Sequence, residues 1–274
     1  MKWKTNFGLK GEATMTKKFL WVLVIIVFTP CLAFAQKDVK KEVTLEFEGR
    51  FWMPDLKGRV KITDHDIGTT VDLREDLDIR DENYWEKRIT WYTGPNSKIR
   101  IAYTQANYEG DEILQRTIKF GEETYTVGTR VVTDVDLRYI RLGWAWQFIN
   151  IGGGTLKLGT LLEGKGFWGK AAIEAPDLAT PIKESARYIF GLPTLGLALN
   201  IRPHKILDIF AEGSGMTAGS YGFVYDAEAG IKLIPIKILS IMGGYRIMEF
   251  RVESDDDFVK ARAHGPFVGV TVRF

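Results

Sequence analysis

The chain has 274 residues, and its 37 Lys and Arg nearly balance its 35 Asp and Glu, giving a formal net charge of +2. Five of the lysines and one glutamate lie in residues 1–35, so residues 36–274 carry 32 basic and 34 acidic side chains and a net charge of −2. This balance excludes a nucleic-acid-binding domain, which would show a clear basic excess. The only cysteine is Cys31, so residues 36–274 cannot form a disulfide bond.

Residues 15–35 have the pattern of a secretory signal peptide. The pair Lys17-Lys18 precedes a continuous apolar run over residues 19–28, and an A-x-A cleavage site ends at Ala35. A run of that length is too short to cross about 30 Å of hydrocarbon as a helix. We therefore expect export, with cleavage between Ala35 and Gln36.

From residue 36 onward the chain alternates apolar and polar side chains, a period of two that predicts β-strands instead of helices. The clearest segments are residues 43–53, 99–104, 194–201 and 223–233. Two further segments change phase. Within residues 135–148 the apolar positions shift by one residue near Tyr139, and a similar break occurs at His264-Gly265-Pro266. A β-bulge inserts one extra residue, so we predict a bulge at each place.

The predicted connections alternate in length along the chain. Short turns are expected at residues 94–98, 150–154 and 202–205 and around Pro235, and longer polar segments at residues 54–84, 109–129, 169–186, 213–221 and 252–258. Short periplasmic turns that alternate with long external loops are typical of outer-membrane barrels. The segments predict an all-β fold, a transmembrane antiparallel up-and-down β-barrel of about ten strands, with eight and twelve as neighbouring alternatives.

A secreted soluble β-sandwich is the other candidate fold, because alternation alone does not say which face is buried. Strands of ten or more residues favour the membrane, since a tilted strand needs about 9–11 residues to cross a bilayer and soluble strands average about five or six. Aromatic side chains also gather near the expected strand ends, as Trp91, Trp146, Tyr108 and Trp168 do. Interfacial girdles lie at that level in membrane barrels. Both features favour the barrel.

The last eight residues, "FVGVTVRF", place Val268, Val270, Val272 and Phe274 on one face of a strand. In this pattern the chain resembles Gram-negative outer-membrane β-barrel proteins, and residues 68–79 are similar to a segment of uncharacterised small barrels. The resemblance implies that these four residues form a signal for the barrel-assembly machinery. It also implies a place in the outer membrane, with membrane lipid and lipopolysaccharide as partners, and we expect a monomer. The predicted organisation is an upstream extension (1–14) before a true start at Met15, the signal peptide (15–35) and the barrel (36–274).

Charged residues on the polar faces of the strands are expected to fill the lumen, since a barrel of this size leaves no wide aqueous channel. The candidates are Glu46, Glu48, Arg50, Arg88, Arg100, Asp134, Asp136, Arg138, Arg141, Glu163, Asp208, Glu212, Asp226, Glu228, Arg246 and Arg251. Arginine dominates the cations, which suits bidentate pairing in a crowded interior. We predict a salt-bridge network, with a narrow gated ion path or a polar ligand pocket as the functional alternatives. No cofactor is expected, and the sequence does not name a ligand.

The weak catalytic candidates are Asp64, His65 and Asp66 in the first long loop and His264 on the last strand. The loop residues have the types found in omptin proteases without their spacing, and the His-x-Ser element of lipid A deacylases is absent. No zinc, phosphate-loop or serine-nucleophile motif occurs. Acidic residues in the first loop offer oxygens to Ca²⁺ or to divalent cations held by lipopolysaccharide, although no EF-hand spacing defines a metal site. We expect a small non-enzymatic barrel, with an outer-membrane enzyme or a narrow solute channel as alternatives.

Overall fold

The computed structural model describes residues 44–61, 69–120, 123–254 and 257–274. The predicted extension and signal peptide lie outside these residues. Strands make up most of the described chain, which also contains one 3-10 turn, η1 (Gly219–Tyr221). No helix in the described ranges is long and apolar enough to cross a membrane.

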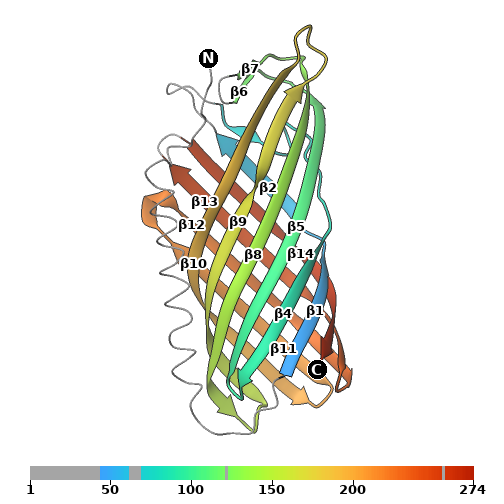
Figure 1. Ribbon diagram of the computed structural model, residues 1–274, viewed down its shortest axis with the longest axis vertical. Helices are drawn as coiled ribbons and strands as arrows, with labels where there is room; N and C mark the ends of the chain where they lie inside the picture. The colour runs from blue at the N-terminus through green and yellow to red at the C-terminus, as the bar shows by residue number, and fades with distance from the viewer. Residues whose placement is uncertain (1–43, 62–68, 121–122, 255–256) are drawn as a thin grey trace.

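Ten antiparallel strands close into a barrel, as the sequence predicted (Figure 1). We call each of the ten a stave, because β1 and β2 together form one of them. In chain order they are β1 (Thr44–Trp52) continued by β2 (Asp55–Lys61), β4 (Tyr84–Gly94), β5 (Ser97–Ile113), β8 (Arg130–Ile151), β9 (Leu156–Ala175), β10 (Ile182–His204), β11 (Leu207–Thr217), β12 (Gly222–Ile236), β13 (Leu239–Ser254) and β14 (Asp257–Arg273). The short strands β3 (Val71–Asp72), β6 (Ile118–Phe120) and β7 (Glu123–Tyr125) belong to the connections at the long-loop end.

The barrel closes where the first stave meets β14. Leu45 and Phe274 exchange backbone hydrogen bonds in both directions, at 3.1 and 2.8 Å. The ladder continues with β2 on the same edge of β14, beyond an interruption at Met53 and Pro54. A proline has no N–H to donate to a ladder, which accounts for the break at this point. Along β14 the two strands therefore act as one stave, while the other edge of β2 pairs with the short strand β3.

The lower half of the barrel, from the short turns up to the level of Tyr139 and Phe167, carries an apolar belt on its outer wall. Trp85, Leu195 and Ile241 point outward there and are more than half exposed. Hydrophobic side chains that face outward around a barrel form its lipid-facing band. The lower half is therefore the membrane-spanning part.

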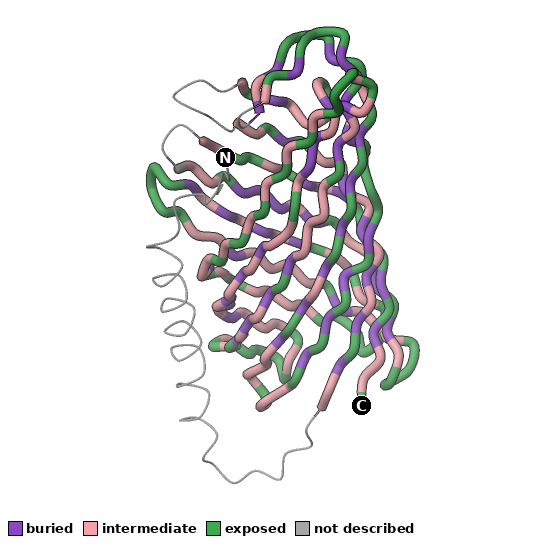
Figure 2. The backbone as a smooth tube through the Cα atoms, turned by 45° about the horizontal axis from the view of Figure 1, so that its top comes forward, coloured by how far each residue is buried: buried purple, intermediate pink, exposed green. Residues whose placement is uncertain are grey.

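The upper half, from that level to the long loops, has the opposite polarity. On β8, Arg141 is buried inside the lower half, whereas in the upper half Val131 is buried inside and Arg138 lies outside. Figure 2 shows buried and exposed residues alternating along the long strands through both halves. Strand β10 has 23 residues, about twice the 9–11 that cross a bilayer. The upper half therefore projects beyond the membrane.

Neither of the two predicted β-bulges, at Tyr139 and at residues 264–266, is present in the ladders of β8 with β9 and of β13 with β14. The ladder between β8 and β9 runs without a shift from Val132 to Gln147, so the bulge predicted at Tyr139 is wrong; an irregularity lies instead between Gln147 and Ile149. The ladder between β13 and β14 is likewise continuous through residues 264–266. The apolar pattern changes phase because the surroundings of the wall change from hydrocarbon to water, while the backbone keeps its register. For the same reason the long segments predicted at 109–129 and 169–186 are largely strand.

Candidate functional site

Two carboxylates and two arginines from four staves meet in the middle of the lumen, and we call this set the central ion square: Glu86 (β4), Arg141 (β8), Asp226 (β12) and Arg246 (β13). Arg141 lies 2.9 Å from Glu86 and 3.2 Å from Asp226. Arg246 lies 2.7 Å from Glu86 and 2.8 Å from Asp226. Each charge thus faces two opposite charges, which is the condition under which buried ions are tolerated.

A second layer of ion pairs lies beside the square, toward the short turns. Glu228 accepts hydrogen bonds from Arg50 at 2.7 Å and from Arg88 at 3.2 Å. Glu48 pairs with the same two arginines. Period two along β1 and β4 positions these side chains, because every second residue of a strand points to the same face. The two layers connect directly, since Arg88 also lies 2.7 Å from Glu86.

Aromatic side chains cover the ion pairs from above. The guanidinium of Arg246 lies 4.6 Å from the ring centre of Trp52, and that of Arg50 lies 4.6 Å from the ring of Phe267. Such contacts attract a cation to the ring face. The hydroxyl of Tyr139 donates to Asp226 at 3.2 Å, so this residue joins the ionic layers to the apolar layer above them.

The apolar layer in the upper half is a stack of rings. Phe167 is fully buried, and its ring centre lies 4.4 Å from Tyr139, 4.8 Å from Phe190 and 5.4 Å from Phe250. These distances are those of well-packed aromatic pairs. The lumen is thus filled by ions below and by rings above.

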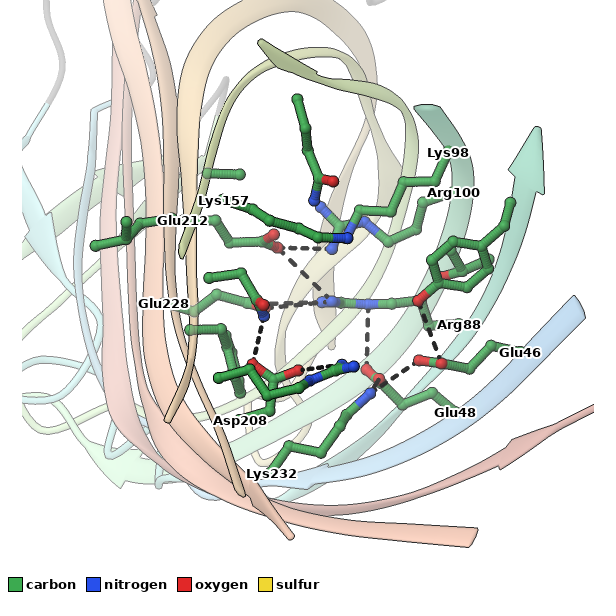
Figure 3. Close-up of a pocket in the computed structure, with 18 of the residues that line it drawn as sticks. Glu46, Glu48, Arg88, Lys98, Arg100, Lys157, Asp208, Glu212, Glu228 and Lys232 are labelled. Atoms are coloured by element: carbon green, nitrogen blue, oxygen red, sulfur yellow. Dashed lines mark hydrogen bonds and ion pairs between the residues drawn. The ribbon is translucent and has the colours of Figure 1, made fainter. Parts of the chain in front are cut away.

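A cavity of about 210 Å³ lies at the short-turn end of the lumen (Figure 3). Its wall has eight cationic residues, Arg50, Arg88, Lys98, Arg100, Lys157, Arg202, Lys232 and Arg273, and five acidic ones, Glu46, Glu48, Asp208, Glu212 and Glu228. Lys232 and Arg273 bind Glu46 at 2.9 and 2.6 Å. Within the described residues, Lys98 and Lys157 have no carboxylate within 4.0 Å. The excess of positive charge makes this water-facing end of the lumen more favourable for small anions than for cations.

The structure brings most of the predicted lumen residues together. Those that lie inside are Glu46, Glu48, Arg50, Arg88, Arg100, Arg141, Glu163, Asp208, Glu212, Asp226, Glu228 and Arg246. Four lie on the outer wall instead: Asp134, Asp136, Arg138 and Arg251. Asp136 and Arg138 pair there at 3.0 Å. Their assignment to the lumen is wrong because they belong to the upper half, where water surrounds the wall and the polar face points outward.

Two buried members of the network were not among the predicted residues. Glu86 lies two positions before Arg88 on the same face of β4, and Lys165 lies two positions after Glu163 on β9. The Lys165 ammonium is 3.3 Å from Glu163 and 3.3 Å from Asp226. Extending the period of two from each neighbouring charge would have found both residues.

Of the four catalytic candidates, the structure describes only His264. Asp64, His65 and Asp66 lie outside the described residues. His264 points away from the lumen, and its Nδ1 lies 2.7 Å from the hydroxyl of Tyr245 on the outer wall. Within the described ranges no group of three or more His, Cys, Asp or Glu residues is arranged to hold a metal ion.

The described part of the acidic first loop is held by arginines. Arg116 donates two hydrogen bonds to Asp76, at 2.8 and 2.6 Å, and lowers the pKa of that carboxyl. Arg74 lies 2.6 Å from Asp81, and Asp78 pairs with Arg80 at 2.8 Å. Carboxylates with such partners are poor candidates for the cation-bridging role that the sequence suggested for this loop.

The four residues of the predicted assembly signal lie on the outer wall of β14. Val268 and Val270 are about half exposed, and the ring of Phe274 contacts that of Phe47 edge-on at 5.8 Å. The side chains therefore continue the apolar belt across the closure between β14 and β1. Their recognition by the assembly machinery stays a prediction.

Comparisons with known proteins agree with the barrel and define no family. No family model and no curated protein matches the chain. The structure of the outer membrane protease OmpT from Escherichia coli is similar, with a TM-score of 0.61 and 8% identity, over 88% of this chain and 100% of that one. The translocator domain of the autotransporter NalP from Neisseria meningitidis matches 96% of this chain and 100% of that one, with a TM-score of 0.49 and 11% identity. At such identities the likeness concerns the fold alone.

The closed ten-stave barrel and its outer apolar belt define the class of protein. The chain is a small integral β-barrel of the Gram-negative outer-membrane type. Proteins of this class reside in the bacterial outer membrane.

Proposed function

We propose that the chain is a non-conducting outer-membrane barrel with a structural or surface-interaction role. In this proposal the lower half anchors the protein in the membrane, and the upper half holds a rigid platform outside it. The observation that supports the proposal is the double closure of the lumen, by the central ion square and by the ring stack of Phe167 above it.

The first closure resists opening because its charges are both buried and paired. The four side chains of the central ion square are between 1 and 4% exposed. A hydrated ion would have to separate these groups, and breaking a buried pair costs about 3–5 kcal/mol. The second closure is centred on the fully buried Phe167, whose ring cannot replace an ion's water shell. The cavity of Figure 3 is accordingly a pocket at the periplasmic end and not one mouth of a channel.

The platform is supported by the packing of the external connections. Leu77 comes from the connection before β4, and Leu114, Ile118 and Tyr125 come from the connection between β5 and β8; each is at most 2% exposed. Buried apolar side chains of this kind fix a loop in one conformation, whereas loop tips with exposed polar residues are mobile. An ordered surface above the membrane suits contacts with other molecules.

The test is conductance in a planar lipid bilayer. We expect the purified barrel to insert without discrete current steps, under conditions in which a general porin gives them. Reproducible unitary currents from the unmodified protein would overturn the proposal in favour of the narrow-channel alternative. The monomeric state and the role of Phe274 in assembly also stay predictions.

A further inference from the structure

The outer wall of the upper half carries a row of three cations on three adjacent staves. Arg251 on β13 is the cross-strand partner of Lys260 on β14, and Lys260 is the partner of Arg59 on β2. Two residues closer to the belt, Arg262 on β14 is the partner of Lys57 on β2. We call these five residues the basic patch. All five side chains are exposed, and that of Arg59 is 66% exposed although it is in an ion pair.

The basic patch is electrostatically unfavourable by itself. Like charges directly opposite each other destabilise a sheet, and the patch contains three such pairs. Three carboxylates offset part of the repulsion. Glu249 lies 3.4 Å from Lys260 and 3.8 Å from Arg262, Asp72 lies 3.3 Å from Arg59, and Glu253 pairs with Arg251. Lys57 has no carboxylate within 4.0 Å among the described residues. The five cations thus exceed their three partners by two charges.

The position of the patch indicates which anion would balance it. In the cross-strand row of Arg262 and Lys57, Tyr225 donates to Glu249 at 2.7 Å, and Tyr245, nearer the short-turn end of β13, bonds to His264. Below these polar-tipped side chains begins the apolar belt, with Ile241 and Val268 exposed to lipid. Tyrosine side chains mark the interface between hydrocarbon and water. The patch therefore lies at the height of the lipid headgroups in the outer leaflet.

We propose that the basic patch binds the phosphate groups of an outer-leaflet glycolipid, that is, the phosphorylated headgroup of lipopolysaccharide. Arginine forks suit bidentate contact with phosphate, and Lys57 and Lys260 add point charges. The acyl chains of the same lipid would lie against the belt below β13 and β14. This site differs from the acidic first loop, whose described aspartates are already paired with arginines.

The proposal predicts that removing the charges of the basic patch does not lower the unfolding temperature without lipopolysaccharide, and weakens binding when lipopolysaccharide is present. The variant Lys57→Gln/Arg59→Gln/Lys260→Gln/Arg262→Gln loses four of the five charges. In detergent free of lipopolysaccharide it should unfold at the same temperature as the unmodified barrel or a higher one, because the repulsion is gone. With lipopolysaccharide added, the unmodified barrel should be stabilised, and the variant should bind at least about tenfold more weakly, since it has lost four cations that attract the anionic lipid.

The experiment titrates both proteins in nonionic detergent with lipopolysaccharide, with the same lipid after enzymatic dephosphorylation, and with inorganic phosphate, and follows the heat-modifiable gel shift. The matched control is Lys205→Gln/Lys237→Gln, which removes exposed lysines from the short-turn end and should bind as the unmodified protein does. Equal binding by the patch variant, equal binding of the dephosphorylated lipid, or full competition by millimolar phosphate would overturn the proposal. If the fourfold variant does not fold, Lys57→Gln/Lys260→Gln carries the same comparison with half the charge change.

Discussion

The two halves of this barrel have opposite polarity, inside and outside, although the same strands run through both. The lower half meets hydrocarbon outside, so its outer wall is apolar and its interior is occupied by Arg–carboxylate pairs. The upper half meets water outside, so its outer wall is charged and its interior is a stack of aromatic rings. The backbone register does not change between them. The comparison teaches that the polarity of a strand face reports the surrounding solvent, and that a reversal of the pattern can mark a membrane boundary instead of a bulge.

The largest expected effect comes from Arg141→Leu in the central ion square. The substitution leaves Glu86 and Asp226 short of a partner inside the lumen, and breaking a buried pair costs about 3–5 kcal/mol. The control is Arg138→Leu, three residues away on the outer wall, where an exposed ion pair contributes about 0–1 kcal/mol. Urea unfolding followed by gel mobility measures both. Similar losses of unfolding free energy in the two variants would contradict the placement of Arg141 in the lumen and of Arg138 on the outer wall.

In the upper half, Phe167→Ala should destabilise the barrel by about 3–5 kcal/mol, as large-to-small changes of buried aromatic residues do. The reason differs from that for Arg141, because the loss is of packing and not of charge compensation. Lys170→Ala, on the outer wall of the same strand, should change the unfolding free energy by less than about 0.5 kcal/mol. An unchanged midpoint for Phe167→Ala would mean that the ring stack does not close the lumen.

Leu142→Arg places a charge on the lipid-facing wall of β8 and should cost about 2–4 kcal/mol, depending on its depth in the bilayer. The same new arginine at Asp134, which is exposed on the outer wall above the belt and faces Glu109, should be nearly neutral because water surrounds it. Insertion into liposomes of defined thickness, scored by protease protection, separates the two variants. Equal insertion of both would place the membrane boundary elsewhere on β8.

The smallest effect concerns the external loop and is a dependence on pH. Arg116 lowers the pKa of Asp76 in the folded protein, so the pair contributes stability above the unfolded carboxyl pKa of about 3.9. That stability is lost as the pH falls through the lowered folded value. The contribution is about 1 kcal/mol or less, because Arg116 is half exposed. Limited proteolysis between pH 6 and pH 3 should show loop cleavage rising at the acid end. In Asp76→Asn the cleavage should be high throughout, and a pH profile like that of the unmodified protein would argue against the pair.

The sequence predicted the architecture well because period two and turn length are local signals. It predicted the lower lumen for the same reason, since Arg88 and Arg141 share a face with their neighbours in a strict alternation. It misassigned Asp136 and Arg138 because one rule, polar side chains inside, was applied along a strand that crosses two solvents. The partners within the network could not be predicted, because they depend on which staves face each other across the closed lumen.

The ion pairs of the lumen also bear on how the barrel is made. Arg246 and Glu86 are 160 residues apart in the chain, and Arg88 and Glu228 are 140 apart. In a partly formed, open sheet these charges would face no partner, and a bare arginine next to lipid is strongly disfavoured. Half-built intermediates inside the bilayer are therefore penalised until β1 reaches β14. The network therefore couples insertion into the membrane to closure of the barrel. Folding in the membrane should be a single cooperative step, and the formation of these distant contacts should set its rate.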